Sequence, residues 1–169
     1  VDNNNITSIS NIALELITFS LDNNITNNLI VSTSNFGADI SSSSSNNLFI
    51  ENEIMSDSNT AVSITGVYNN SFQQNLFLSN DSAAIDINSG SAGNLFLSNN
   101  FTGDEFGIFL QESSNNLFKD CIQISGSTSV YNNFGTSSNI TFVNCSYAFE
   151  NIQDAGSELT RKWYYMALS

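Results

Sequence analysis

The sequence predicts an all-β fold, a solenoid of stacked parallel strands with about six to seven rungs, and two observations support it. The first is a short phrase, typically Asn-Leu-Phe followed by a turn, that returns along the chain. Its copies are NNLIVST (27–33), NNLFIEN (46–52), QNLFLSN (74–80), GNLFLSN (93–99), NNLFKDC (115–121) and the looser SNITFVNC (138–145). The second is a set of alternating apolar pairs between these copies. Such repetition indicates one structural unit stacked on itself, as in a parallel β-helix.

The phrases and the apolar pairs each predict a short strand with one buried face. The central apolar residues of successive phrases stand 19, 28, 19, 22 and 24 residues apart. The pairs between the phrases are Ala38/Ile40, Val62/Ile64, Ile85/Ile87 and Ile108/Leu110. Alternation of this kind is typical of a strand that packs one face on a core. Asn, Ser and Gly favour turns between the strands, so each repeat holds at least two strands.

Composition and charge exclude several classes of protein. The 169 residues suffice for one domain with a core. The net charge is −13, and the basic residues are Lys119, Arg161 and Lys162. Because phosphate binding requires Lys and Arg, we expect no nucleic-acid partner. No apolar stretch reaches the roughly 20 residues that a membrane-spanning helix needs, so we also expect no membrane insertion.

The chain resembles the NosD-like repeats of the pectin-lyase-like superfamily. The matching residues are the phrase Asn94-Leu-Phe-Leu-Ser-Asn99 and the run Phe-Gly-Ile-Phe-Leu at 106–110. The resemblance implies a right-handed parallel β-helix from an archaeal or bacterial surface protein, and so an extracellular or cell-surface location. We expect a cap or first rung over 1–27, β-helix repeats over 28–150, and a C-terminal strand or transition segment over 151–169.

Stacked repeats should bring equivalent side chains into contact along the axis, since rungs lie about 4.8 Å apart. Phe rings would stack on one another, and Asn amides would bond to the next rung. The predicted ladder consists of Phe49, Phe77, Phe96, Phe118, Phe142, Asn52, Asn80 and Asn99. We interpret these positions as structural, not as a ligand site.

Two cysteines occupy the ladder position in which earlier repeats carry Asn. Cys121 and Cys145 end consecutive phrases, so their Cα atoms should lie within disulfide distance. In an extracellular protein a disulfide would brace the last rungs. The alternative is a pair of buried free thiols that act as small apolar fillers. A metal site is not expected, because the chain has no His and two Cys do not complete a tetrahedral set.

The position of Lys119 predicts an outward-facing apolar surface. Lys119 directly follows Phe118, where other phrases carry an aliphatic residue, and a Lys buried in the core would be costly. The residues on either side of each Phe should therefore point outward and line one outer sheet. They are Leu48, Leu76, Leu95, Leu117, Ile50, Leu78 and Leu97. Proteins seldom leave such a patch bare, so either the chain's own ends or another subunit should cover it.

The C-terminal tail supplies a second predicted contact. Trp163, Tyr164 and Tyr165 belong to a strand-like aromatic run. Such a strand would complete a sheet in a neighbouring molecule by β-addition. The expected partners are therefore other copies of the chain or neighbouring surface-protein domains, with glycans as the alternative.

No catalytic centre is predicted. Asp39 and Asp86 share the outward position between the apolar pairs, but Ser63 holds the same position on the rung between them. Asp104 and Glu105, in a long turn, are weak candidates for Ca²⁺ and the only candidate metal ligands. No cofactor is expected. Among the Asn-x-Ser/Thr sequences, Asn69 and Asn100 are the favoured glycosylation sites because we place them in turns.

The sequence therefore predicts a non-catalytic structural module that self-assembles or packs laterally in a surface layer, sheath, filament or adhesin stalk. The alternative is a carbohydrate-binding module that uses exposed aromatic residues such as Tyr68, Phe109 and Tyr131. A third reading is a degenerate polysaccharide lyase, which the scarcity of basic residues disfavours.

Overall fold

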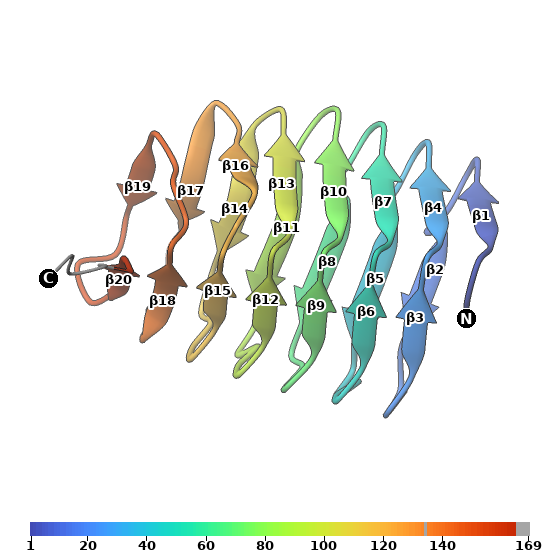
Figure 1. Cartoon of the computed structure of the whole chain (residues 1–169), viewed down its shortest axis with the longest axis horizontal. Coiled ribbons are helices and arrows are strands. Elements are labelled where there is room, and N and C mark those ends of the chain that lie inside the picture. Colours follow the sequence, from blue (N-terminus) through green and yellow to red (C-terminus); the bar gives the residue numbers. More distant parts are fainter. Residues whose placement is uncertain (134, 165–169) are drawn as a thin grey trace, which may run out of the picture.

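The computed structural model describes residues 1–133 and 135–164, which form strands and turns without any helix. Three parallel sheets run along the molecule and enclose one core (Figure 1). The chain visits each sheet once per turn as far as β18, so neighbouring strands in a sheet are three apart in sequence order up to that point. In the last turn β19 pairs with β17 and β20 with β18, which are two apart, because the β1 sheet ends at β16. The fold is a parallel β-helix of about seven turns, as the sequence predicts.

We name each sheet after its first strand. The β1 sheet contains β1 (Asn5–Ser8), β4 (Leu29–Ser32), β7 (Glu53–Ser56), β10 (Leu76–Ser79), β13 (Asn100–Gly103) and β16 (Gln123–Ser125). The β2 sheet contains β2 (Leu14–Leu16), β5 (Ala38–Ser41), β8 (Val62–Thr65), β11 (Ala83–Asn88), β14 (Phe106–Leu110), β17 (Thr128–Asn132) and β19 (Glu150–Ile152). The β3 sheet contains β3 (Asn24–Thr26), β6 (Leu48–Ile50), β9 (Ser71–Gln73), β12 (Leu95–Leu97), β15 (Leu117–Lys119), β18 (Ile140–Val143) and β20 (Leu159–Lys162).

The predicted apolar pairs form the inner face of the β2 sheet. Ala38 pairs with Val62, and Ile40 with Ile64, while the later pairs continue in the same register. All eight of these side chains are buried. Residues 1–27 contain the three strands of the first turn, and β20 extends the β3 sheet beyond residue 151.

From β3 to β18, each strand of the β3 sheet lies between two corners that share one local conformation. At each corner a residue with positive φ is followed by a residue that points into the corner. Before β12 the left-handed residue is Gly93 (φ 69), and before β9 it is Asn69 (φ 58). Gly, Asn and Asp adopt this conformation at least cost, which explains their frequency at these positions.

Two columns of Asn side chains, all buried except Asn23, hold the corners of successive turns together. One column is Asn23, Asn47, Asn70, Asn94 and Asn116, and the other is Asn28, Asn52, Asn75 and Asn99. Asn52 is representative: its backbone N–H and its Nδ2 both donate to Asn75 Oδ1, at 2.9 and 3.0 Å. Its Nδ2 also donates to the carbonyl oxygen of Ile25 at 2.8 Å. One amide therefore links three turns and satisfies polar groups that the corner would otherwise bury unpaired.

A column of Phe rings fills the core beneath the β3 sheet. Phe49, Phe72, Phe96, Phe118 and Phe142 stack with centroid distances of 4.6–4.9 Å. All of these rings have 0% exposure. Neighbouring rings are nearly parallel, with interplanar angles of 7–18°, which allows the offset contact that aromatic pairs favour.

The predicted ladder was wrong at two positions because the phrase occurs on two different sheets. Phe77 lies in β10 of the β1 sheet, where it pairs with Ile54 and Phe101, and the turn between Phe49 and Phe96 is filled by Phe72. Asn80 is exposed and donates to Asp57 Oδ1 at 3.0 Å, whereas Asn75 occupies the ladder position. Asn occurs at the corner before a β3-sheet strand and again at the corner after it, where the next β1-sheet strand begins. The same Asn-containing phrase therefore precedes strands of both sheets.

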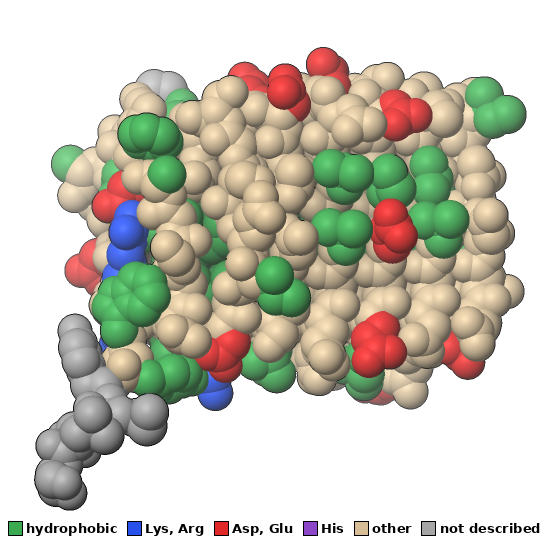
Figure 2. Space-filling view, turned by 45° about the horizontal axis from the view of Figure 1, so that its top comes forward, with side chains coloured by type: hydrophobic (Ala, Val, Ile, Leu, Met, Phe, Trp, Pro, Cys, Tyr) green, Lys and Arg blue, Asp and Glu red, His purple; other side chains and the backbone are tan. Residues whose placement is uncertain are grey.

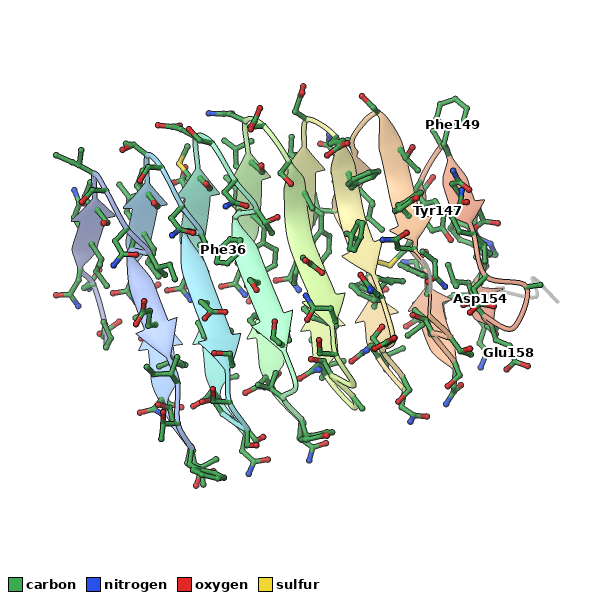
Figure 3. The ribbon with its side chains drawn as sticks, turned by 180° about the vertical axis from the view of Figure 1, so that it is seen from behind. Phe36, Tyr147, Phe149, Asp154 and Glu158 are labelled. Carbon is green, nitrogen blue, oxygen red and sulfur yellow. A yellow bond between two sulfur atoms is a disulfide. The ribbon has the colours of Figure 1, made fainter. Side chains whose placement is uncertain are left out.

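Tyr147 covers the C-terminal end of the Phe column. Its ring packs edge-on against Phe142 at 5.2 Å, and the Arg161 guanidinium lies 3.7 Å from the ring centroid. Glu150 accepts a hydrogen bond from the Tyr147 hydroxyl and forms an ion pair with Arg161, each at 2.9 Å. Figure 3 shows Tyr147 beside the last turns, with Phe149 at the rim.

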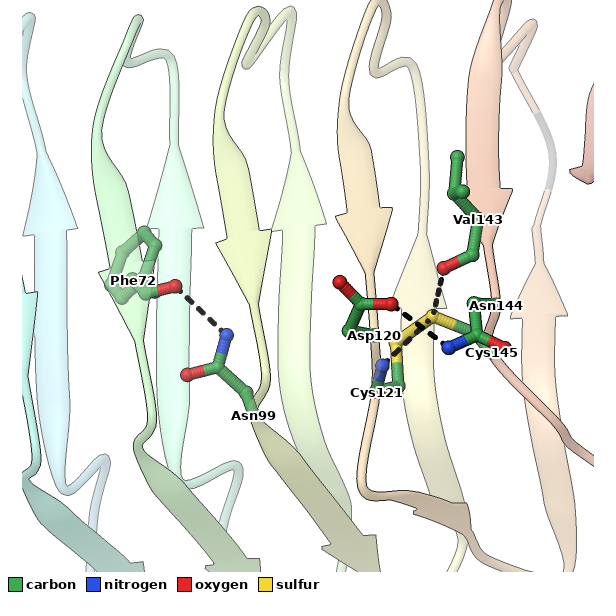
Figure 4. Close-up of a disulfide and its surroundings, with 7 residues drawn as sticks. All are labelled: Phe72, Asn99, Asp120, Cys121, Val143, Asn144 and Cys145. Carbon is green, nitrogen blue, oxygen red and sulfur yellow. Dashed lines mark hydrogen bonds between the residues drawn. A yellow bond between two sulfur atoms is a disulfide. The ribbon is translucent and has the colours of Figure 1, made fainter. Parts of the chain in front are cut away.

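The structure pairs Cys121 with Cys145 in a disulfide whose Cα atoms are 4.8 Å apart. The two residues continue the Asn column after Asn99, and Figure 4 shows them one and two turns beyond it. The Cys121 N–H lies 3.3 Å from Cys145 Sγ, the place where earlier turns present an Asn oxygen. A covalent link thus replaces the amide ladder in the last turns, where it closes a loop of 24 residues.

Candidate functional site

A recess lies on the outer face of the β2 sheet. Its volume is about 300 Å³. The lining residues are Phe36, Asn59, Thr60, Ser82, Ala83, Asp86, Glu105, Phe106 and Phe109. Figure 3 looks at this side of the molecule and labels Phe36. We call this recess the Asp86 pocket.

The pocket exists because small residues stand between large ones at one corner. Strand register places Phe36, Thr60, Ala83 and Phe106 in equivalent positions of four successive turns. At about 4.8 Å per turn, the two Phe residues are roughly 14 Å apart along the axis. Thr60 and Ala83 leave the space between the two Phe side chains open. The result is a slot two turns wide with an aromatic side chain at each end.

Phe106 and Phe109 form the wall nearest the C-terminus, and Tyr131, which does not line the pocket, packs against both. Phe106 stacks on Tyr131 with a centroid distance of 4.7 Å and an interplanar angle of 21°. Phe109 lies 5.4 Å from both of these rings. Each ring is only partly buried, so the cluster offers apolar surface to a ligand while its members hold one another in place.

Asp86 is the acidic group held inside the pocket. It points outward from the middle of β11, and its partner on the next turn is Phe109. Its Oδ1 atom is buried and has no hydrogen-bond partner. Burial among neutral and aromatic neighbours raises the pKa of Asp86 to about 6, since a carboxylate is poorly solvated there. A carboxyl group of this kind in a recess is a candidate ligand-binding group.

The surrounding face is acidic. As predicted, Asp39, Ser63 and Asp86 occupy one outward column, and Glu15 precedes Asp39 in the same register. Burial raises the pKa of Asp39, opposed by hydrogen bonds from Ser41 and Ser63. The three Lys and Arg side chains belong to β15 and β20 of the β3 sheet, so the pocket lining contains no cation.

The Ca²⁺ candidates lie in the turn between β13 and β14. Asp104 and Glu105 are both exposed, and of the two only Glu105 lines the pocket. Among residues 1–133 and 135–164, no three His, Cys, Asp or Glu side chains gather into a potential metal site.

The prediction that the aliphatic residues line one outer sheet was wrong, because they lie on two sheets. Leu48, Ile50, Leu95, Leu97 and Leu117 lie on the outer face of the β3 sheet, where Ser71 and Gln73 interrupt them. Leu76 and Leu78 lie on the β1 sheet, where the register adds Leu29, Val31 and Met55 to form one patch around Glu53. Figure 2 shows hydrophobic side chains gathered over neighbouring turns of this face, with an acidic side chain among them.

The other predicted positions are scattered. Trp163 and Tyr164 follow β20 and are exposed, and Tyr165 lies outside the described residues. Asn69 is exposed at a corner, as expected for a glycosylation site. Asn100 is not in a turn but in β13, where its Oδ1 accepts a hydrogen bond from Thr102.

Sequence reasoning identified Asp86, Phe109 and Tyr131 as outward-facing but missed the pocket that Asp86 and Phe109 line. Phe36 and Phe106 stand just outside the alternating apolar pairs, so no pattern in a single turn marks them. The pocket becomes visible only when successive turns are aligned. The same corner position then carries Phe, Thr, Ala and Phe, and the two small residues leave a gap between the two Phe side chains.

The comparisons with known proteins agree with this architecture. A family model described as "Right handed beta helix region" matches residues 1–147. The chain therefore belongs to the right-handed parallel β-helix family, as the predicted resemblance to pectin-lyase-like repeats implied. A search of curated proteins and a search of solved structures each found no significant match. Among the described residues, no helix is long and apolar enough to cross a membrane.

Proposed function

We propose that this chain is a non-catalytic carbohydrate-binding module, of the NosD-like type found in cell-surface proteins, and that it binds a saccharide in the Asp86 pocket. The observation that carries the proposal is an aromatic-walled slot with a carboxyl group on its floor. Aromatic rings pack against the apolar faces of sugar rings, and a carboxyl group fixes their hydroxyl groups through hydrogen bonds.

The dimensions and rigidity of the slot support this assignment. A volume of about 300 Å³ falls within the range of small-molecule sites, and the slot is open to solvent. Asp86, Phe106 and Phe109 stand on strands whose register is fixed by parallel pairing on both sides. A rigid, open slot can hold one or two units of a saccharide chain without closing around it. Binding to such a slot loses little affinity to ordering of the protein.

The absence of cations from the pocket lining supports binding without catalysis. A uronate lyase requires a base and positive groups beside the substrate carboxylate. Lys119, Arg161 and Lys162 are on the β3 sheet, away from the pocket lining. An acidic pocket should also repel uronate polymers, so the proposed ligands are neutral or positively charged sugars.

Titration calorimetry with three sets of oligosaccharides tests the proposal. We expect binding of cello-oligosaccharides or glucosamine oligomers and none of galacturonate oligomers. Phe106→Ala should weaken binding by at least about tenfold, the equivalent of one aromatic contact. Tyr68→Ala is the matched control, because Tyr68 is exposed but does not line the pocket.

Three results would contradict the proposal. They are failure of all three sets to bind, equal losses in the two variants, and release of new reducing ends from the bound oligomers. The last result, if it disappeared in Asp86→Asn, would assign a glycosidase instead.

A second candidate role is lateral packing in a surface assembly, which the β1-sheet patch favours. Leu29, Val31, Met55, Leu76 and Leu78 share an outer face over three consecutive turns. If this face mediates self-association, Leu76→Asp should convert oligomers into monomers in analytical ultracentrifugation. Leu95→Asp, on the outer face of the β3 sheet, should leave the oligomers intact. A wild-type chain that sediments only as a monomer would exclude this role.

A further inference from the structure

We infer that the Asp86 pocket selects an amine-bearing sugar, whose protonated amino group lies between the Asp86 carboxylate and the rings of Phe106 and Phe109. This inference rests on the proposed function and names the class of saccharide. The ligand would be a polymer or oligomer with free amino groups, as distinct from its N-acetylated or uronic counterparts.

The first support is a carboxyl group with no positive partner. Asp86 Oδ1 is buried and unpaired, and none of the lining residues carries a positive charge. The Val1 ammonium donates to the Asn24 carbonyl oxygen in the first turn, and Arg161 pairs with Glu150 in the last turns. Because an ionised buried carboxylate requires compensation, a cation supplied by the ligand stabilises it where the protein does not.

The second support is the aromatic wall. A cation placed over the face of a Phe ring is attracted by the electron density of that face. Phe109 is the register partner of Asp86 on the next turn, so ring and carboxyl group are side by side. Phe36 lies at the other end of the slot. Rings combined with one acidic group are a recurrent means of recognising ammonium groups.

The third support is the charge of the rim. Glu105 lines the pocket, and Asp39 and Glu15 continue the acidic column on the same face. The whole chain carries −13. The resulting field concentrates cationic ligands near the slot and disfavours anionic ones. A neutral acetamide gains nothing from this field, so the field favours binding of the free amine over its N-acetylated counterpart.

Titration calorimetry with glucosamine hexamer and N-acetylglucosamine hexamer, each at pH 5 and pH 7, tests the inference. The amines of the oligomer lose protons as the pH approaches their pKa, so each dissociation constant is expressed per protonated amine. Asp86 ionises between pH 5 and pH 7, so on this basis the glucosamine oligomer should bind about tenfold more tightly at pH 7 than at pH 5. The acetylated oligomer should bind more weakly and show no such change.

Two variants assign the effect to Asp86. Asp86→Asn should remove the preference for the amine and its pH dependence while retaining the aromatic walls. Asp39→Asn is the matched control, because Asp39 occupies the same column but does not line the pocket. A thermal melt of each variant establishes that it is folded before binding is measured.

The possible results separate the inference from the proposed function. Equal binding of the two hexamers would overturn the amine preference and leave saccharide binding standing. Loss of the preference in Asp39→Asn as well as Asp86→Asn would attribute it to the general field of the face and overturn the specific subsite. Failure of all saccharides, including cello-oligosaccharides, would overturn both.

Discussion

Replacing Asn75 by Ala should lower the free energy of unfolding by about 3–5 kcal/mol. The side chain accepts two hydrogen bonds from Asn52 and donates one to Phe49 O and one to Asn99 Oδ1, all within 2.9–3.0 Å. All of these groups are buried, and Ala leaves at least two of them without a partner. Each unpaired buried group costs about 1–3 kcal/mol. Urea denaturation followed by far-ultraviolet circular dichroism measures the loss.

Asn80→Ala is the matched control for this prediction. Asn80 ends the phrase 74–80 that also contains Asn75, but its side-chain amide is exposed and bonds only to Asp57. Its replacement should change stability by no more than about 0.5 kcal/mol, as is usual for surface positions. If the two variants lost equal stability, the column assignment would be wrong.

Replacing Asp86 by Asn should stabilise the protein at neutral pH by about 2–3 kcal/mol. Burial raises the pKa of Asp86 from an ordinary value of 3.8 to about 6. Between these values the folded protein retains a proton that the unfolded chain releases, so stability falls as the pH rises through this window. Above about pH 6.5 the full cost is present, at 1.36 kcal/mol for each pKa unit. Asn has the same shape and carries no charge.

Denaturation of both proteins at pH 4 and pH 7.5 measures this effect. The difference between variant and wild type isolates Asp86, because the other acidic groups titrate alike in both. We expect a difference near zero at pH 4 and its maximum at pH 7.5. Asp81→Asn, at an exposed position in the preceding turn, should show a small difference at either pH. A variant less stable than wild type at pH 7.5 would mean that the carboxylate is favourably bound.

A destabilising carboxyl group inside a recess is more consistent with a binding role than with a structural one. The ladder residues of this protein each improve packing or satisfy a polar group, whereas burial of the Asp86 carboxylate costs free energy and leaves its Oδ1 without a hydrogen-bond partner. Groups retained against stability are typical of functional sites. The two denaturation experiments therefore contrast Asn75, which stabilises the fold, with Asp86, which destabilises it.

The sequence predicts the solenoid and its inner face well, because both depend on local patterns. The alternation around Ala38 and Ile40 appears within four residues, and Lys119 shows which side of its strand points outward. The column of Phe rings was only partly predictable. Phe72 lies in Ser-Phe-Gln, which lacks the Leu of the repeated phrase, so the phrase does not mark it. The phrases at 74–80 and 27–33 belong to another sheet.

The irregular spacing of the phrases contained the missing information. The intervals of 28 and 19 residues between Phe49, Phe77 and Phe96 together span two turns, but neither equals one turn. Phe49, Phe72 and Phe96, in contrast, are each separated by the length of a single turn. The pocket could not be predicted in this way. It depends on which side chains of four separate turns share a corner, and that alignment requires the register of every intervening strand.

The two Asn columns also have a direction. In every step the donor lies on the earlier turn and the acceptor on the later one, from Asn23 to Asn47 and from Asn28 to Asn52 onward. Each column therefore has a donor end and an acceptor end, and every internal Asn side chain both donates and accepts a hydrogen bond along it. Asp could receive but not give, so it cannot replace an internal Asn. A whole turn that carries Asn at both corners satisfies its neighbours on either side. A molecule built in this way can change its length by complete turns while leaving the chemistry of its existing faces in place.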